Sequence, residues 1–295
     1  MRNWSNWSSS FIYFRLLQIT AFGLFTGRAW QHLTQGGPYR AFFWKEDWMK
    51  PIVTALVDVD WTDYVTSPRT DATIVGLEVG LGIVFASLAV AVFLLKKMPL
   101  RWGWFLMISG AVLLFGLAFC YFLDKNLQWG QWWEYSAQFG TPIFLAVAAY
   151  RTIDQLKWKF WMRAAVAVTF VCHGLYALGY YPQPGDFVSM MMNGFGMSEG
   201  ASKTWLIYAG IADLIVAVGL FIPVGWIVRT SLWYMVAWGL LTTFARLYAN
   251  FLPGLTFSDL SYWIPHVLYR FPHFMLPLVL LVMYRKESDA KTDLR

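Results

Sequence analysis

The feature that most constrains the fold of this chain is a series of long apolar runs. A helix that crosses a bilayer needs roughly 20 mainly apolar residues, and eight runs come close to that length. They lie near residues 11–34, 72–95, 102–123, 136–151, 161–180, 204–228, 231–252 and 264–284. The fourth run is the weakest, because it is short and contains Pro142. We therefore predict an all-α integral membrane protein with about eight transmembrane helices.

The composition supports the membrane class. The chain is 58% hydrophobic and 14% charged, and it contains 18 Trp, whereas a soluble domain carries about 25% charged residues. The net charge of +6 does not indicate a nucleic-acid partner, because the basic residues cluster in short loops, as topology signals do. Membrane lipids are the expected surroundings.

The basic loops also predict the orientation of the chain. Segments such as "KKMPLR" and "RTIDQLKWKFWMR" join consecutive runs on one side, and "RKESDAKTDLR" ends the chain. Since Lys and Arg favour the cytoplasmic side, we expect both termini in the cytoplasm. The opposite loops are longer and more aromatic, and one of them contains "SMMMNGFGM". That segment fits a plug over the mouth of the bundle and a helix lying on the membrane equally well.

The two halves of the chain resemble each other. "PIFLAVAAYR" closes the fourth run and "PLVLLVMYR" closes the eighth, and the first and fifth runs both end in a Gly/Pro turn followed by an aromatic segment. The pattern predicts two four-helix halves of the same orientation, residues 1–155, with an outer interfacial segment at 38–66, and residues 156–295. Binding sites of such parallel repeats favour the interface between them.

Ionisable residues inside the runs are the candidates for function, because a charge in a membrane is costly and usually faces the interior of the bundle. All of them fall in the outer half of the predicted bundle, so we expect most of them to line one outward-facing polar cavity. As proton-handling groups we predict His173, His273 and Asp213, with Asp213 orienting a basic neighbour. As ligand-binding groups we predict Arg28, His32, Glu78, Arg246, His266 and Arg270. Arg246 and Arg270 would hold the anionic or carbonyl end of the ligand.

Structural roles compete with these assignments. Arg246 and Asp213 could form an ion pair that only supports the fold, and Arg28 and His32 could extend to the lipid headgroups. No metal site is expected, because His266 and His273 lie about 10 Å apart along one helix and no metal-ligand spacing is present.

Residues 165–285, with "HGLYALGYYPQPGDFVSMMMNGFGMSEGASKTWLIYAGIADLIVAVGLFIP" as the clearest stretch, resemble the DoxX-like group of membrane proteins. Their core is four helices, and the group includes membrane subunits of thiosulfate:quinone oxidoreductase. The segment "GRAWQHL…PYRAFFW" is distantly similar to HTTM bundles of the vitamin-K-dependent carboxylase type, but this chain lacks the large lumenal domain that accompanies carboxylation. The resemblance implies a quinone- or lipid-associated subunit in a bacterial inner membrane, and it supplies no catalytic residues.

We therefore expect a membrane subunit of a redox complex that binds a quinone or small anion, with other membrane or periplasmic subunits as partners. Quinone is the candidate cofactor, and the sequence leaves open whether the chain itself catalyses a reaction. The alternative is a non-enzymatic scaffold that binds lipid or cargo or supports a larger membrane assembly. A transporter would require helices broken within the membrane, for which Pro223, Pro272 and Pro277 are the candidate positions.

Overall fold

The protein is built from helices. The computed structural model describes residues 9–56, 58–251 and 257–292, and the described residues form helices and turns without a strand. The first half contains the long helices α1 (Ser9–Thr34), α5 (Pro68–Leu94), α6 (Leu100–Asp124) and α8 (Ser136–Tyr150). The second contains α9 (Gln155–Leu178), α11 (Glu199–Gly219), α12 (Gly225–Ala249), α13 (Phe257–Leu268) and α14 (Pro272–Thr292). The all-α prediction is thus confirmed.

Each of the eight predicted runs contains helix, but not every helix is long and apolar enough to cross a membrane. Five segments of the described chain meet that condition: Pro68–Lys97, Leu100–Asp124, Gln155–Leu178, Glu199–Gly219 and Leu260–Tyr284. Helix α8 has 15 residues and rises only about 22 Å, less than the roughly 30 Å of a hydrocarbon core. Several apolar helices indicate a multi-pass membrane protein, and the number of eight crossings stays a prediction.

Prolines lie at two of the helix boundaries in the second half. Helix α11 ends at Gly219, ahead of Pro223, and α12 begins at Gly225, because proline lacks an N–H and cannot continue a helix. The predicted boundary at 228–231 was therefore wrong, and Arg229 lies inside α12. Pro272 begins α14 after a break that separates it from α13, whereas Pro277 lies within α14 without ending it.

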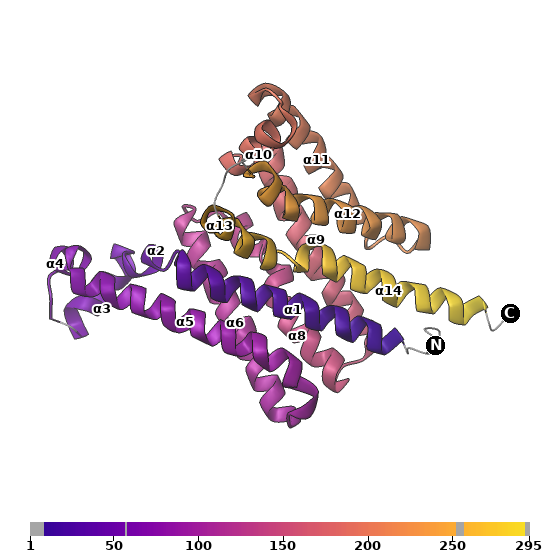
Figure 1. Cartoon of the computed structure of the whole chain (residues 1–295), viewed down its shortest axis with the longest axis horizontal. Helices are drawn as coiled ribbons and strands as arrows, with labels where there is room; N and C mark the ends of the chain where they lie inside the picture. Colours follow the sequence, from indigo (N-terminus) through magenta and orange to yellow (C-terminus); the bar gives the residue numbers. More distant parts are fainter. Residues whose placement is uncertain (1–8, 57, 252–256, 293–295) are drawn as a thin grey trace.

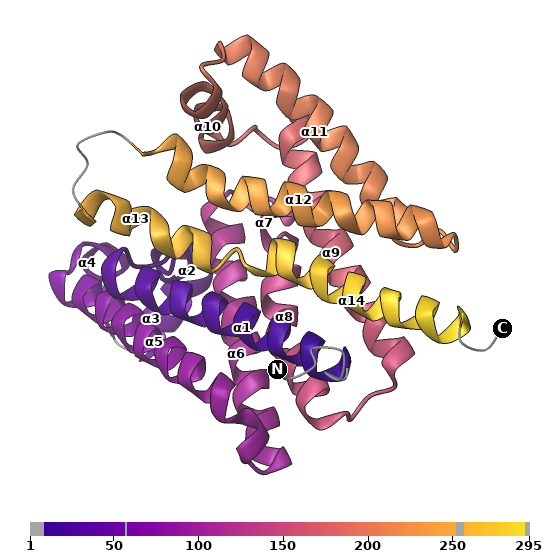
Figure 2. The same ribbon diagram turned by 45° about the vertical axis from the view of Figure 1, so that its right-hand side comes forward.

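The two halves pack in the same pattern (Figure 1). In the first half α1 packs on α5 and α6 packs on α8; in the second α9 packs on α11 and α12 packs on α14. The halves meet where α1 lies against α14 and where α8 lies against α9, and Figure 2 shows α1 and α14 side by side from a second direction. This repetition is what a duplicated bundle would display, while the duplication itself stays a prediction.

Short helices gather at one end of the bundle. They are α2 (Arg40–Phe43), α3 (Glu46–Leu56), α4 (Trp61–Thr66), α7 (Trp129–Trp133) and α10 (Gly185–Phe195). Figures 1 and 2 show α3, α4 and α10 opposite the end at which α1 begins and α14 finishes. The bundle thus has a short-helix end and a termini end.

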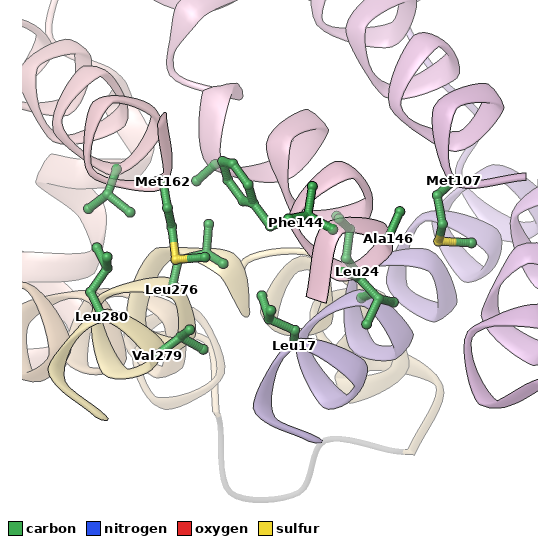
Figure 3. Packing of buried hydrophobic residues seen from close by; sticks show 14 of the residues in the cluster. Leu17, Leu24, Met107, Phe144, Ala146, Met162, Leu276, Val279 and Leu280 are labelled. Atoms are coloured by element: carbon green, nitrogen blue, oxygen red, sulfur yellow. The ribbon is translucent and has the colours of Figure 1, made fainter. Parts of the chain in front are cut away.

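The hydrophobic core lies where the two halves meet. Figure 3 shows side chains of α1, α8, α9 and α14 packed together, with Met107 of α6 at the edge. The labelled core residues are Leu17, Leu24, Met107, Phe144, Ala146, Met162, Leu276, Val279 and Leu280. Burial of this joint core fixes α1 and α14 against each other, so it also fixes the break that precedes α14.

Glycine permits the closest helix contacts around this break. A Cβ on Gly27 of α1 would lie 2.5 Å from the backbone nitrogen of Tyr269, and a Cβ on Gly239 of α12 would lie 2.8 Å from the carbonyl oxygen of His273. Side chains at these positions would force the backbones apart. The two glycines therefore let α1 and α12 hold the broken segment from both sides.

Candidate functional site

A cavity of about 80 Å³ lies in the second half, between α9, α10, α11, α12 and the break before α14. Five of the predicted site residues line it: His173, Asp213, Arg246, Arg270 and His273. Its remaining walls are mainly apolar and are formed by side chains such as Phe170, Phe187, Met190, Met191, Phe195 and Trp238. A polar cluster in an apolar wall is typical of small-molecule sites.

Each polar group reaches the cavity from a different element. His173 lies in the last turns of α9, Asp213 in the middle of α11, and Arg246 in the last turn of α12. Arg270 lies in the break itself, and His273 lies in the first turn of α14. Because Pro272 interrupts the helix, Arg270 and His273 can face one cavity without belonging to one continuous helix.

The two histidines of the cavity stack on each other. Their ring centroids are 5.1 Å apart and their planes differ by 16°. The Nδ1 of His273 lies 3.0 Å from the carbonyl oxygen of Arg270, and since a carbonyl can only accept, Nδ1–H donates. Neutral His273 therefore keeps its lone pair on Nε2, where it can accept a proton.

Glu134, from the first half of the chain, extends this histidine pair. Its Oε2 lies 3.6 Å from Nε2 of His173, and its Oε1 accepts a 2.7 Å hydrogen bond from Gln131. Burial raises the pKa of the Glu134 carboxyl to about 7, and the guanidinium groups of Arg270 and Arg246 oppose this rise. A group with a pKa near the working pH can both accept and release a proton.

The two arginines of the cavity lack a carboxylate at ion-pair distance among the described residues. Arg246 is 6% exposed and donates to the carbonyl oxygen of Thr242 at 2.9 Å. The Nε of Arg270 is buried, and none of the residues that the structure describes forms a hydrogen bond with it. Burying unpaired charge costs several kcal/mol, so the pair provides a strong preference for an anion or another hydrogen-bond acceptor.

The contacts of Asp213 differ from both predicted roles, which were the orientation of a basic neighbour and an ion pair with Arg246. It is 3% exposed, and its Oδ1 accepts a 3.2 Å hydrogen bond from the hydroxyl of Tyr234. Within the part of the chain that the structure describes, no ion pair joins it to Arg246. Asp213, in the wall of the cavity, thus fixes the hydroxyl of Tyr234 of α12.

Arg28 does not line this cavity. It is completely buried and donates to Gln31 at 2.7 Å and to Gln138 at 2.6 Å. Its guanidinium lies 3.9 Å from the ring centre of Tyr269 and 5.2 Å from that of Tyr135. Amide and aromatic groups therefore hold Arg28 between the halves, and it does not extend to the headgroups.

His32 and Glu78 also lie outside the cavity, and both support the turn after α1. His32 donates through Nδ1 to the carbonyl oxygen of Arg28 at 2.7 Å and accepts at Nε2 from the hydroxyl of Tyr39 at 2.7 Å. Glu78 accepts from the backbone N–H of Gly37 at 3.3 Å and lies 3.6 Å from Arg40. Because both ring nitrogens of His32 form hydrogen bonds, its role is to support this turn.

His266 is likewise outside the cavity. Its Nδ1 donates to the carbonyl oxygen of Tyr262 at 3.0 Å, and its ring packs against those of Tyr262, Trp263 and Tyr269. The prediction of one cavity shared by eight of these residues was thus wrong for Arg28, Glu78 and His266. His32, which was predicted to bind the ligand, lies outside the cavity as well. The physical reason is that each of them has other partners: amide and aromatic groups for Arg28, backbone and Tyr39 for His32, Gly37 and Arg40 for Glu78, and backbone and aromatic rings for His266.

The segment "SMMMNGFGM" forms the C-terminal part of α10 and the start of the connection after it. Helix α10 supplies Phe187, Met190, Met191 and Phe195 to the wall of the cavity. This placement agrees with the plug rather than with a helix that only contacts lipid. Methionine side chains are flexible, so such a cover can adapt to different occupants.

Comparisons with known proteins give no assignment: no family model, no curated protein and no solved structure matches this chain. The DoxX-like resemblance therefore stays a prediction, and the function has to be inferred from the geometry of the cavity.

Proposed function

We propose that this protein is a membrane subunit that binds the polar head of a quinone or small anion in the cavity between α9, α10, α11, α12 and α14, in the service of a redox complex. The binding role rests on the geometry, and the redox role rests on the resemblance alone. The single observation that carries the binding role is Arg270 at the wall of the cavity, whose Nε is buried and has no partner in the described part of the chain.

The arginines would bind the ligand, and the histidines would accept and donate protons. A guanidinium donates to a carbonyl or oxyanion, and Arg246 approaches the cavity from α12 while Arg270 approaches it from the break before α14. His273 offers a free Nε2, and the stacked His173 lies beside Glu134. Reduction of a quinone consumes two electrons and two protons, so it needs a proton supply and an electron-donating partner subunit. The residues at the cavity fit the first requirement.

Ligand retention tests the proposal. The full chain is purified in mild detergent, and bound small molecules are extracted and identified by mass spectrometry. Arg270→Ala is expected to lose the bound molecule, while Arg229→Ala, which removes an exposed arginine at the start of α12, is expected to keep it. If both variants retain the bound molecule equally, the cavity is not its binding site.

The alternative is a scaffold without a ligand of its own. It is supported by large aromatic side chains exposed at the termini end, such as Trp102, Trp161, Trp226 and Trp233, each more than half exposed. The same side chains fit an aromatic belt at the membrane surface. A stoichiometric partner in the purified material, together with an empty cavity in wild type, would favour the scaffold.

A further inference from the structure

An apolar groove of about 370 Å³ runs beside the cavity, between α10, α11 and α12. Its lining is almost entirely aromatic or aliphatic. The residues that line the groove but not the cavity are Met197, Trp205, Tyr208, Ala212 and Tyr234. The hydroxyl of Tyr234 is directed away from the groove, to Asp213 of the cavity.

The groove and the cavity adjoin each other, because they share wall residues. The shared residues are Met191, Phe195, Ala209, Trp238 and Leu241. The two spaces together form one binding path with a charged end and an apolar end. This asymmetry matches an amphiphile and not a water-soluble ion, which would gain nothing from the apolar end.

The groove opens on a surface that suits the hydrocarbon of a membrane. Helix α11 is one of the five candidate membrane spans, and a third of its most apolar window is buried inside the protein. Large apolar side chains cover its outside, among them Trp205, Ile211, Ile215 and Val218. Contiguous exposed apolar surface of this kind marks contact with lipid, so a tail lying in the groove can continue into the bilayer.

The size of the charged end limits the head of the amphiphile. A cavity of about 150 Å³ accommodates benzene, whereas the charged end has about 80 Å³. A head of a few heavy atoms fits this space, and a substituted quinone ring does not without displacing α10. Arg246 and Arg270, which have no carboxylate at ion-pair distance among the described residues, favour a head that carries negative charge.

We infer that the natural ligand is a single-chain amphiphile with a small anionic head, whose head lies at Arg246 and Arg270 and whose tail leaves through the groove between α11 and α12. The inference rests on the proposed binding role of the cavity, and it selects the anion over the quinone. It also implies that the ligand enters sideways from the membrane, past α10 and Trp238.

Photo-crosslinking tests both ends of the path. The full chain in lipid nanodiscs receives palmitate that carries a diazirine in the middle of its chain, and labelled residues are mapped by mass spectrometry. Crosslinks are expected on the groove side of α11 and α12, and unlabelled palmitate should compete, while acetate and hexadecanol should not. Acetate lacks the tail and hexadecanol lacks the charge.

Two variants on one helix separate the groove from the cavity. Ala212→Trp fills the groove without touching the cavity, and Ile215→Trp places the same side chain on the exposed surface of α11. Ala212→Trp should lower crosslinking at least about tenfold, which corresponds to about 1.4 kcal/mol, and Ile215→Trp should leave it unchanged. Ala212→Leu serves the same purpose if the larger variant does not fold.

The outcomes are distinguishable. If Arg270→Ala abolishes crosslinking and Ala212→Trp and Ala212→Leu do not reduce it, the tail path is wrong and the proposed cavity stands. If none of the three has an effect, the cavity itself is not a ligand site. If a long-tailed quinone displaces the probe and palmitate does not, the anionic head is wrong.

Discussion

Glu134 and His173 bring the two halves of the chain together at the cavity: the carboxylate Oε2 lies 3.6 Å from the imidazole Nε2. The adjacent residues Glu134 and Tyr135, and likewise Tyr269 and Arg270, belong to two different groups of side chains. Tyr135 and Tyr269 flank Arg28, whereas Glu134 lies beside His173 and Arg270 lines the cavity together with the histidines. One polar layer thus contains a structural cluster around Arg28 and a cavity with unpaired charge.

The Glu134 carboxyl should make stability depend on pH. Burial raises its pKa from the ordinary 4.5 to about 7, so between these values the folded protein binds a proton that the unfolded chain lacks. Its contribution to stability is therefore fully present below about pH 4.5 and is lost as the pH rises through 7. Since one pKa unit corresponds to about 1.4 kcal/mol, the loss is on the order of 3 kcal/mol. Thermal unfolding in detergent from pH 5 to 8 measures it.

Glu134→Gln should remove this part of the pH dependence, because the amide does not titrate. Glu46→Gln is the matched control: Glu46 is exposed and pairs with Lys50 at 3.1 Å, so its removal should leave the pH profile of wild type. A Glu134→Gln profile as steep as that of wild type would contradict the assignment.

Arg28 should behave as a structural residue. Arg28→Ala leaves the amide oxygens of Gln31 and Gln138 without their donor, and each unpaired buried acceptor costs about 1–3 kcal/mol. We expect a loss of about 3 kcal/mol in the free energy of unfolding, measured by thermal unfolding in detergent. Ligand retention per folded molecule should stay at the wild-type level, and a selective loss of ligand at wild-type stability would return Arg28 to the binding site.

Part of this site could be predicted from the sequence, and part could not. The rule that charges within membrane helices face the interior is sufficient to select Arg246, Arg270 and His273. The same rule cannot separate them from Arg28, because its partner Gln138 lies 110 positions away. Glu134 was missed because "QWWEY" has the composition of an outer aromatic loop, and only the packing of α7 and α8 on α9 brings it to His173.

The fold, too, could be predicted from the sequence only in part. Apolar length was enough to find the helices, and Pro272 marked a possible break. Helices α12 and α14 pack so closely that position 239 needs a glycine. This contact joins residues that are far apart in the chain, so no local sequence pattern predicts it. The position of the cavity depends on these distant contacts rather than on any single motif.

Gly239→Ala should disturb the site through the backbone. Its Cβ would lie 2.8 Å from the carbonyl oxygen of His273, so α12 and α14 must separate and His273 must move. We expect both lower stability and weaker ligand retention. Gly116→Ala on α6 is the control, because nothing lies within 4 Å of the added Cβ, and Ala in place of Gly in a helix stabilises by roughly 0.5–1 kcal/mol. Equal behaviour of the two variants would refute the close contact.

The orientation of the chain can be tested with single introduced cysteines. The natural Cys120 and Cys172 are both buried, so a membrane-impermeant maleimide should give little background. Asp63 lies exposed on α4 at the short-helix end, and Lys97 lies exposed after α5 at the termini end. If the termini are cytoplasmic, Asp63→Cys is labelled in intact cells and Lys97→Cys only after lysis. The reverse pattern would invert the topology, and the cavity, which α10 covers at the short-helix end, would then face the cytoplasm.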